Sequence, residues 1–200
     1  MNLQEAGDLE SGRTDRRVRY TKMVLKQSLL ELMKTRPINK ITVTEICELA
    51  DVNRGTFYTH YTDPYDLLNQ IENELFEKIH ESLGRKLNFS DVSDLLVDIF
   101  EAIQENRDLC AVLFSDFGDK DFLKRIVYIA KESSIKEWKK QAPDVDESTL
   151  DMLYIFTANG SVGVIESWIK DGMKENVRQL AELINLVSYK GMQAFLYGQD

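Results

Sequence analysis

The stretch from Asn53 to His60 gathers side chains that could bond to nucleic acid. Arg54 carries a guanidinium that can bind guanine through two hydrogen bonds, and the methyl group of Thr56 could touch a thymine. Gly55 would let a backbone approach closely. Three more residues offer groups suited to phosphates: Tyr58, Thr59 and His60. An ordinary helical hairpin with a polar outer face would have the same composition, so the spacing alone leaves both interpretations open.

Two short helices joined by a tight turn are predicted over residues 40–61. Thr42 and Glu45 have the spacing of a capping box, in which each side chain accepts from the other residue's backbone N–H. Three apolar residues at helical spacing give the first helix a core-facing side: Ile46, Leu49 and Ala50. Asp51 tolerates the left-handed conformation that a tight turn needs, and Asn53 is a good N-cap for the second helix.

The same residues carry a resemblance to a known family. The run 41–63 contains four characteristic pieces: Thr42-Val43 before Ile46, Ala50-Asp-Val52, Arg54-Gly-Thr-Phe-Tyr58 and His60-Tyr61. This pattern resembles the DNA-binding domain of the TetR family of transcriptional regulators, and the close match covers about residues 18–68. The remainder resembles the family in length, helical character and a glycine-bearing penultimate helix. The resemblance favours the DNA-binding interpretation.

The predicted DNA-binding residues come from both short helices: Thr42, Thr44, Asn53, Arg54, Gly55, Thr56, Tyr58, Thr59 and His60. Phe57 and Tyr61 are expected to face the core and fix the angle of the second helix. A two-fold dimer would present two copies of the 53–60 helix about one DNA turn apart, ~34 Å, which suits a palindromic double-stranded operator.

One position departs from the family pattern. Members often have a lysine where Pro64 stands, reaching a phosphate from the start of the next helix. That contact is missing here, and Tyr65 or the amides of the helix start would replace it in part. Asp63 as N-cap and Pro64 at the first helical position predict that this helix begins here and continues to about Lys86.

Charge is divided unevenly along the 200-residue chain, whose net charge is −9. Residues 13–62 hold ten Lys or Arg against five Asp or Glu, a charge of +5, whereas residues 63–200 hold 15 against 26, a charge of −11. A basic head on an acidic body would bind DNA on one face and repel it elsewhere. We expect a flexible tail over 1–12, a helix-turn-helix domain over 13–62 and a helical ligand-binding and dimerisation domain over 63–200.

Composition argues against several other classes of protein. The apolar fraction of 43% is that of a globular protein, no apolar run approaches the ~20 residues of a membrane-spanning helix, and no secretory signal is visible. Cys47 and Cys110 lie far apart, without metal-site or disulfide spacing, which suits the reducing cytoplasm. His80 follows Glu77 at E-x-x-H spacing, but no second such pair exists, so neither a metal nor a cofactor is expected.

The predicted fold class is all-α, with about nine helices. Besides the two short helices, helical patterns cover 14–35, 64–86, 90–105, 109–114, 120–141, 148–170 and 174–197. No stretch alternates convincingly with the period of two that a strand would show.

The last two of these helices are predicted to form a dimer interface. Residues 152–165 carry no charge, and Gly160, Ser161 and Gly163 would let another backbone approach closely. The last helix is apolar on more than one side, so one side needs a partner. The resemblance implies a four-helix bundle between two subunits, with these residues near the interface: Ile165, Trp168, Leu183, Val187 and Phe195.

The resemblance also implies a small-molecule effector bound among the helices between residues 90 and 170. Aromatic residues are frequent there, but such a set is more often plain core than a ligand cage, so no effector-binding residue is named. A repressor that the effector releases from DNA is the expected role.

An enzyme and a protein-binding adapter are the two alternative classes of protein. An enzyme is opposed by the lack of any Cys–His, Ser–His–Asp, phosphate-loop or metal set; an acidic all-helical adapter whose helix-turn-helix binds protein stays open.

Overall fold

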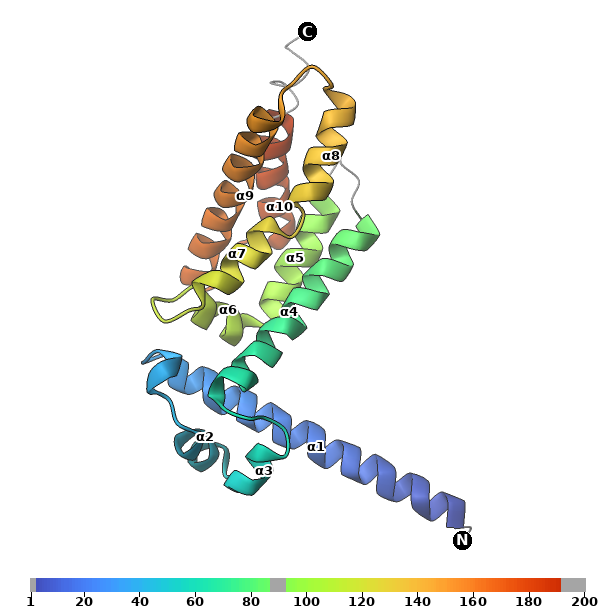
Figure 1. Ribbon diagram of the computed structural model, residues 1–200, viewed down its shortest axis with the longest axis vertical. Coiled ribbons are helices and arrows are strands. Elements are labelled where there is room, and N and C mark those ends of the chain that lie inside the picture. The colour runs from blue at the N-terminus through green and yellow to red at the C-terminus, as the bar shows by residue number, and fades with distance from the viewer. Residues whose placement is uncertain (1–2, 87–92, 192–200) are drawn as a thin grey trace. The chain divides into compact units, whose positions relative to one another are not determined.

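The protein is helical throughout the part of the chain that the structure describes. A computed structural model describes residues 3–86 and 93–191 (Figure 1). These residues form helices, turns and loops without a strand, so the predicted all-α fold class is confirmed.

Contacts divide the chain into two compact units. Unit 1 comprises residues 1–72 with 115–117, and unit 2 comprises residues 73–114 with 118–200. The division therefore falls inside the continuous helix α4 (Pro64–Lys86), later than the predicted boundary between residues 62 and 63. The first turns of α4 belong to unit 1 because their apolar side chains, including Leu67, are buried as part of it.

Unit 1 is built from short and long helices around one core. Its elements are α1 (Leu3–Met33), the 3-10 turn η1 (Ile38–Lys40), α2 (Val43–Ala50), α3 (Arg54–Tyr58) and the first part of α4. Helix α2 packs against α1 and α3. Side chains with almost no exposed surface come from all four helices: Leu25, Leu29, Met33, Ile46, Phe57, Leu67 and Ile71. Burying each such side chain contributes about 1.5–3 kcal/mol, so this core fixes α2 and α3 on α1.

Two features of unit 1 differ from expectation. The first helix begins at Leu3, so it includes residues 3–12, which were expected to precede it as a tail. Leu49 is 52% exposed and lies outside the core-facing side of α2, which is supplied by Ile46 and Cys47 instead.

Unit 2 holds the remaining helices. These are α5 (Ser93–Glu105), α6 (Arg107–Leu113), α7 (Lys120–Tyr128), α8 (Lys131–Gln141), α9 (Glu147–Lys170) and α10 (Val177–Ile184), followed by the π-helical turn η2 (Asn185–Lys190). Helix α10 packs on α5, and α8 packs on α9 (Figure 1). Trp138, Leu150 and Tyr154 form an apolar cluster between α8 and α9.

The predicted helix over 120–141 is two helices, α7 and α8, separated at Ile129 and Ala130. The hydroxyl of Tyr154, in α9, donates a hydrogen bond to the carbonyl oxygen of Val127 at 2.8 Å. The last carbonyls of a helix lack intrahelical partners, so this bond stabilises the end of α7. The break depends on a residue distant in sequence, with no glycine or proline to mark it.

The final helix also differs from its prediction over 174–197. The side chain of Asn176 accepts from the backbone N–H of Arg178 at 2.9 Å and also from that of Gln179, so α10 begins at Val177. After Ile184 the backbone widens into η2, which starts at the buried polar residue Asn185. The rest of that prediction, including Phe195, lies outside the described residues.

Candidate DNA-binding site

The start of α2 is fixed by the predicted capping box. The backbone N–H of Thr42 donates to Glu45 Oε2 at 2.9 Å, and the N–H of Glu45 donates to Thr42 Oγ1 at 3.3 Å. The Thr42 hydroxyl also donates to Glu45 Oε2 at 2.8 Å. This hydroxyl bond is the main reason that the pKa of Glu45 lies below its usual value; the Thr42 amide and Arg36, whose guanidinium lies 2.8 Å from the carboxylate, lower it further. The single O–H of Thr42 is thus engaged within unit 1.

The turn between α2 and α3 has the predicted geometry. Asp51 adopts the left-handed conformation, with φ of 53° and ψ of 46°. The backbone N–H of Val52 then donates to the carbonyl of Cys47 at 3.0 Å, which closes the turn. Asp has a smaller steric penalty in this conformation than most residues, so the turn is made without a glycine.

Helix α3 is only five residues long and depends on its two ends. At its start, Asn53 Oδ1 accepts from the N–H of Gly55 at 2.7 Å, which confirms the predicted N-cap. On its inner side Phe57 is completely buried, with its ring centroid 5.6 Å from that of Tyr61, which is also buried. Both aromatic residues face the core as predicted, and together they fix the orientation of the opposite face.

That opposite face carries the predicted DNA-binding side chains. Arg54, Gly55, Tyr58 and Thr59 are exposed, and Thr56 and His60 are half-buried. Within the described residues the Arg54 guanidinium has no paired acid. The Thr59 hydroxyl, in contrast, donates to the carbonyl of Thr56 at 2.6 Å. Thr44 is exposed in the first turn of α2. The two threonines at 42 and 59 therefore use their O–H groups locally. Arg54, Tyr58 and Thr44 are exposed and present their polar groups outward.

The start of α4 is acidic. Asp63 Oδ1 accepts from the N–H of Asp66 at 2.9 Å, confirming the predicted cap, and Asp66 Oδ2 accepts from the N–H of Thr62 at 2.8 Å. The Thr62 amide, followed by Gln70, lowers the pKa of Asp66. Two carboxylates therefore flank Pro64, where the family often has a lysine. Tyr65 is half exposed and is the nearby side chain able to reach a phosphate.

The two cysteines are buried, as expected for small apolar residues. Burial raises the pKa of Cys47 and raises that of Cys110 to about 12. His80 is exposed and stacks on Phe76, with ring centroids 6.1 Å apart. No group of three His, Cys, Asp or Glu side chains suited to a metal ion occurs in the part of the chain that the structure describes.

The predicted dimer residues divide into two groups. Leu183 and Val187 are 48% and 61% exposed, as an interface between subunits requires. Ile165 and Trp168 are buried, and Trp168 meets Phe100 edge-on with ring centroids 5.0 Å apart. These two residues therefore pack in the core of unit 2, and their place near a dimer interface stays a prediction.

Other exposed apolar residues lie on α9 and η2: Met152, Ile155 and Phe156 on α9, and Leu186 on η2. Phe156 alone is 73% exposed. Their spacing along α9 places them on one side of the helix. The sequence carried this signal, but the uncharged stretch 152–165 did not show which of its sides faced the core.

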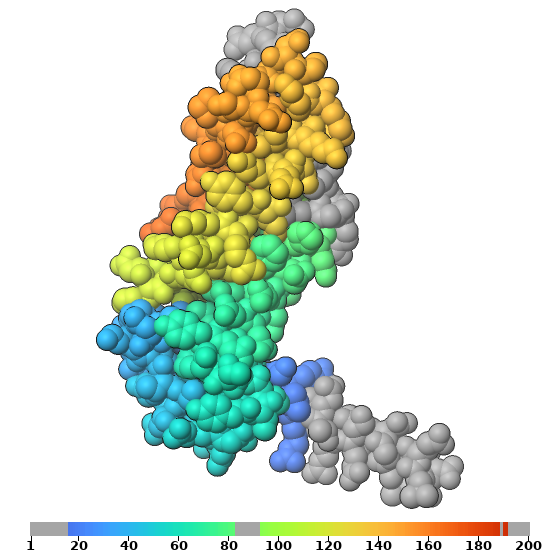
Figure 2. Space-filling model, viewed as in Figure 1, coloured from blue at the N-terminus to red at the C-terminus, as the bar shows by residue number. Residues whose placement is uncertain are grey.

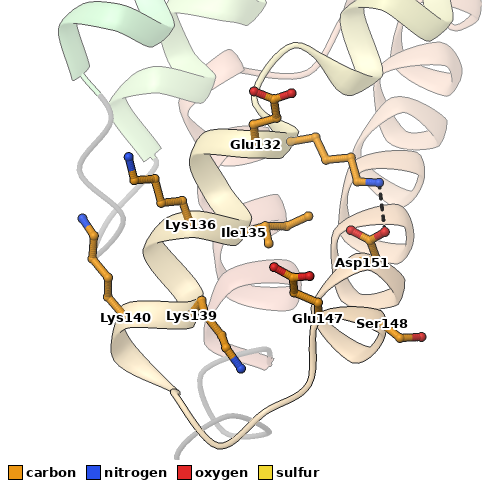
Figure 3. A pocket seen from close by; sticks show the side chains of 9 residues that line it. Glu132, Ile135, Lys136, Lys139, Lys140, Glu147, Ser148 and Asp151 are labelled. Atoms are coloured by element: carbon orange, nitrogen blue, oxygen red, sulfur yellow. Dashed lines mark hydrogen bonds and ion pairs between the residues drawn. The ribbon is translucent and has the colours of Figure 1, made fainter.

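A groove of about 700 Å³ lies between α8 and the start of α9 (Figure 3). Its lining is mostly charged: Lys131, Glu132, Ile135, Lys136, Lys139, Lys140, Glu147, Ser148 and Asp151. Lys131 Nζ lies 3.2 Å from Asp151 Oδ2, and Lys139 Nζ donates to the carbonyls of Pro143 and Val145 at 2.9 and 2.6 Å. Small-molecule pockets are mostly lined by apolar side chains, so this groove is better described as a charged surface. It holds one ion pair, and Lys139 bonds from it to the loop between α8 and α9.

A known protein family matches the second half of this chain. The TetR-type family model described as "Transcriptional regulator C-terminal region" matches residues 90–190. The chain belongs to the TetR family of transcriptional regulators. The resemblance noted for residues 18–68 is thereby confirmed from the other half of the chain.

Individual relatives agree with the TetR assignment. An uncharacterized HTH-type transcriptional regulator of Bacillus subtilis (strain 168), YxbF, is 38% identical over 63 residues, which cover 32% of this chain and only 16% of that relative. The solved structure of a TetR transcriptional regulator from Streptococcus agalactiae 2603V is 25% identical, with a TM-score of 0.62 over 90% of this chain and 99% of its own. A TerR/AcrR-family regulator from Aquifex aeolicus VF5, at 19% identity, has the same fold, with a TM-score of 0.56 over 88% of this chain and 99% of its own.

These relatives are transcriptional regulators by name. Among the described helices of this TetR-family chain, none has the length and apolar character needed to cross a membrane.

Proposed function

We propose that this TetR-family regulator is a repressor that binds a palindromic DNA operator as a homodimer and is released by a small-molecule effector. The observation that carries the proposal is the state of α3. Arg54 stands exposed and without a paired acid among the described residues, on a helix held by the Asn53 cap and by buried Phe57. An exposed guanidinium held in a fixed orientation is suited to a guanine edge in the major groove.

The other residues of the site would contact either bases or phosphates. Arg54, Gly55 and Thr56 face the bases, while Tyr58, His60 and Thr44 hold phosphates. Asn53 caps α3 through Oδ1, which leaves its amide N–H groups for a phosphate. Thr42 and Thr59 donate their hydroxyls within the protein, so their contribution is to position the two helices, and any phosphate contact would use their backbone.

Dimerisation would use the exposed apolar side of α9 with α10 and η2. Monomeric proteins seldom expose a contiguous apolar patch of this kind without a partner. Leu183, Leu186 and Val187, near the end of the chain, would form one apolar surface together with Met152 and Phe156 of α9. A two-fold axis through this surface would bring two copies of α3 to one duplex, as a palindrome requires.

An effector would act by binding the non-DNA state more tightly. A nearly complete switch needs a difference in affinity of about 5.5 kcal/mol between the two states. Helix α4 runs without interruption from unit 1 into unit 2, so it is the element through which a ligand bound in unit 2 would act on α3.

Selection of bound duplexes from a random pool tests the proposal. We expect enriched sequences with two inverted half-sites spaced by about one DNA turn. Binding of the selected duplex, followed by fluorescence anisotropy, should weaken with log salt at a slope of about −0.9 per neutralised phosphate. A protein that binds no duplex at low salt would contradict the proposal and favour the alternative of an acidic adapter whose helix-turn-helix binds protein.

A further inference from the structure

The beginning of α1 extends beyond the core of unit 1. Between residues 16 and 24 every side chain is exposed or half-buried, and the first fully buried one is Leu25. Figure 1 shows α1 continuing past α2 and α3 toward its start, and in Figure 2 its first described side chains, in dark blue, stand out from the body of unit 1. A helix that packs on its own domain buries a stripe along its length. Here the stripe weakens to half-buried Val18, Thr21 and Val24, and the side chains between them are exposed. Packing on unit 1 therefore does not explain the exposed side of this part of α1.

The same part of α1 is strongly basic. Residues 16–22, here named the basic segment, contain four bases and no acid: Arg16, Arg17, Arg19 and Lys22. Arg16, Arg17, Arg19 and Lys22 are all exposed. Tyr20 is 63% exposed among them, so its hydroxyl is available as a donor. Arg16, Arg17 and Lys22 therefore present positively charged donors that an anionic partner could use.

We propose that the basic segment is a second DNA-binding surface, which holds backbone phosphates in addition to those contacted through α2 and α3. Three observations point to duplex DNA as the partner. The basic segment lies in the same compact unit as α3; residues 63–200, by contrast, carry a charge of −11, which would repel DNA; and duplex DNA offers about one phosphate per 1.7 Å, a density that several neighbouring bases can neutralise together.

This second surface rests on the proposed function and deepens it. Phosphate contacts fix the position of a protein on the duplex but carry no sequence information. The basic segment therefore adds affinity and salt dependence equally on all sequences, while discrimination between sequences stays with α3.

Two variants of the full chain with the same change in charge test the inference. The test variant replaces three bases of the basic segment: Arg16→Gln, Arg17→Gln and Lys22→Gln. The control variant replaces three exposed bases of unit 2: Lys120→Gln, Lys136→Gln and Lys174→Gln. Binding to a mixed-sequence duplex of about 40 base pairs is followed by fluorescence anisotropy from about 50 to 200 mM salt, the range over which phosphate contacts change affinity most visibly. Poly-glutamate of similar length serves as an acidic polymer that is not nucleic acid.

The slope of log affinity against log salt should become shallower by about two to three per bound protomer in the test variant, and should stay unchanged in the control variant. Equal slopes in wild type and test variant would overturn the inference while the proposed function stands, and so would equal losses in the two variants, which would reflect net charge alone. Binding of poly-glutamate as tightly as DNA would also overturn it. A wild-type protein that binds no duplex would instead defeat the proposed function itself.

Discussion

The Arg54 guanidinium stands in solvent at the start of α3, and the Asn53 cap and buried Phe57 limit where it can reach. A bidentate pair with guanine discriminates against other bases by about 1–3 kcal/mol. We expect Arg54→Ala to lose discrimination by that amount between a selected duplex and a scrambled one of equal length. Competition binding at fixed salt measures it. An equal loss on both duplexes would show that Arg54 contacts only phosphates.

Tyr58 provides the contrasting case. Its side chain is exposed and its ring lies edge-on to Phe57, with centroids 5.6 Å apart, so Tyr58→Phe removes the hydroxyl and keeps the packing. We expect this variant to weaken binding to selected and scrambled duplexes alike, by about the 0.5–1.5 kcal/mol of one hydrogen bond, or up to about 3 kcal/mol because the acceptor is charged. The same competition assay checks it. A loss confined to the selected duplex would place Tyr58 at a base.

At the scale of single residues, the sequence predicted local chemistry well and burial less well. The capping box of Thr42 and Glu45, the left-handed Asp51 and the Asn53 cap were all confirmed, because each depends on atoms within a few positions along the chain. Leu49 was expected on the core-facing side of α2 and is exposed instead. Helical spacing shows which residues share a side, but the side that is covered depends on segments far away in the sequence.

Helix α3 is so short that its cap should decide its stability. Asn53→Ala removes the acceptor for the Gly55 N–H, and we expect it to lower the free energy of unfolding by about 0.5–2 kcal/mol. Asn53→Asp keeps an oxygen in the same place, and a negative charge is favourable at a helix start. Urea unfolding should therefore separate the two variants, with Asn53→Asp close to wild type.

DNA binding should rank the same two variants differently. In Asn53→Asp the introduced carboxylate would face phosphates and the amide donors would be lost, so this stable variant should bind every duplex more weakly than wild type. Anisotropy at low salt measures the difference. If Asn53→Asp binds as wild type does, Asn53 is remote from the DNA backbone and acts only as a cap.

At the scale of elements, helices with strong local signals were predicted nearly to the residue. The start of α4 at Pro64 follows from Asp63 and Pro64 themselves. The separation of α7 from α8 could not be predicted, because the bond that stabilises it comes from Tyr154, far along the chain. The widening at η2 has no glycine or proline signal either.

At the scale of the whole molecule, the sequence predicted two parts of opposite charge and one apolar surface without a partner. The structure divides the chain into two units and exposes a continuous side of α9, with Met152, Ile155, Phe156, Gly160 and Gly163 at helical spacing. The proposed dimer would cover this side. Burial in the dimer depends on a second chain, which one sequence does not describe.

The two glycines of this side allow a test in which the protomer and the dimer respond in opposite directions. A Cβ atom added at Gly160 or Gly163 would meet nothing within 4 Å inside the protomer. Alanine is favoured over glycine in a helix interior by about 1 kcal/mol. We therefore expect Gly160→Ala with Gly163→Ala to raise the free energy of unfolding of the dilute, monomeric protomer by up to about 2 kcal/mol.

In the dimer the same methyl groups should be unfavourable, because the glycines are proposed to let a partner backbone approach α9 closely. Overpacking costs about 1–3 kcal/mol, which corresponds to a dimer Kd raised by about 5- to 150-fold. Sedimentation equilibrium measures the Kd, and Glu101→Ala, at an exposed position of α5, serves as a control expected to leave it unchanged. If the double variant is more stable and its Kd equals that of wild type, the glycines lie outside the interface and the subunits meet elsewhere.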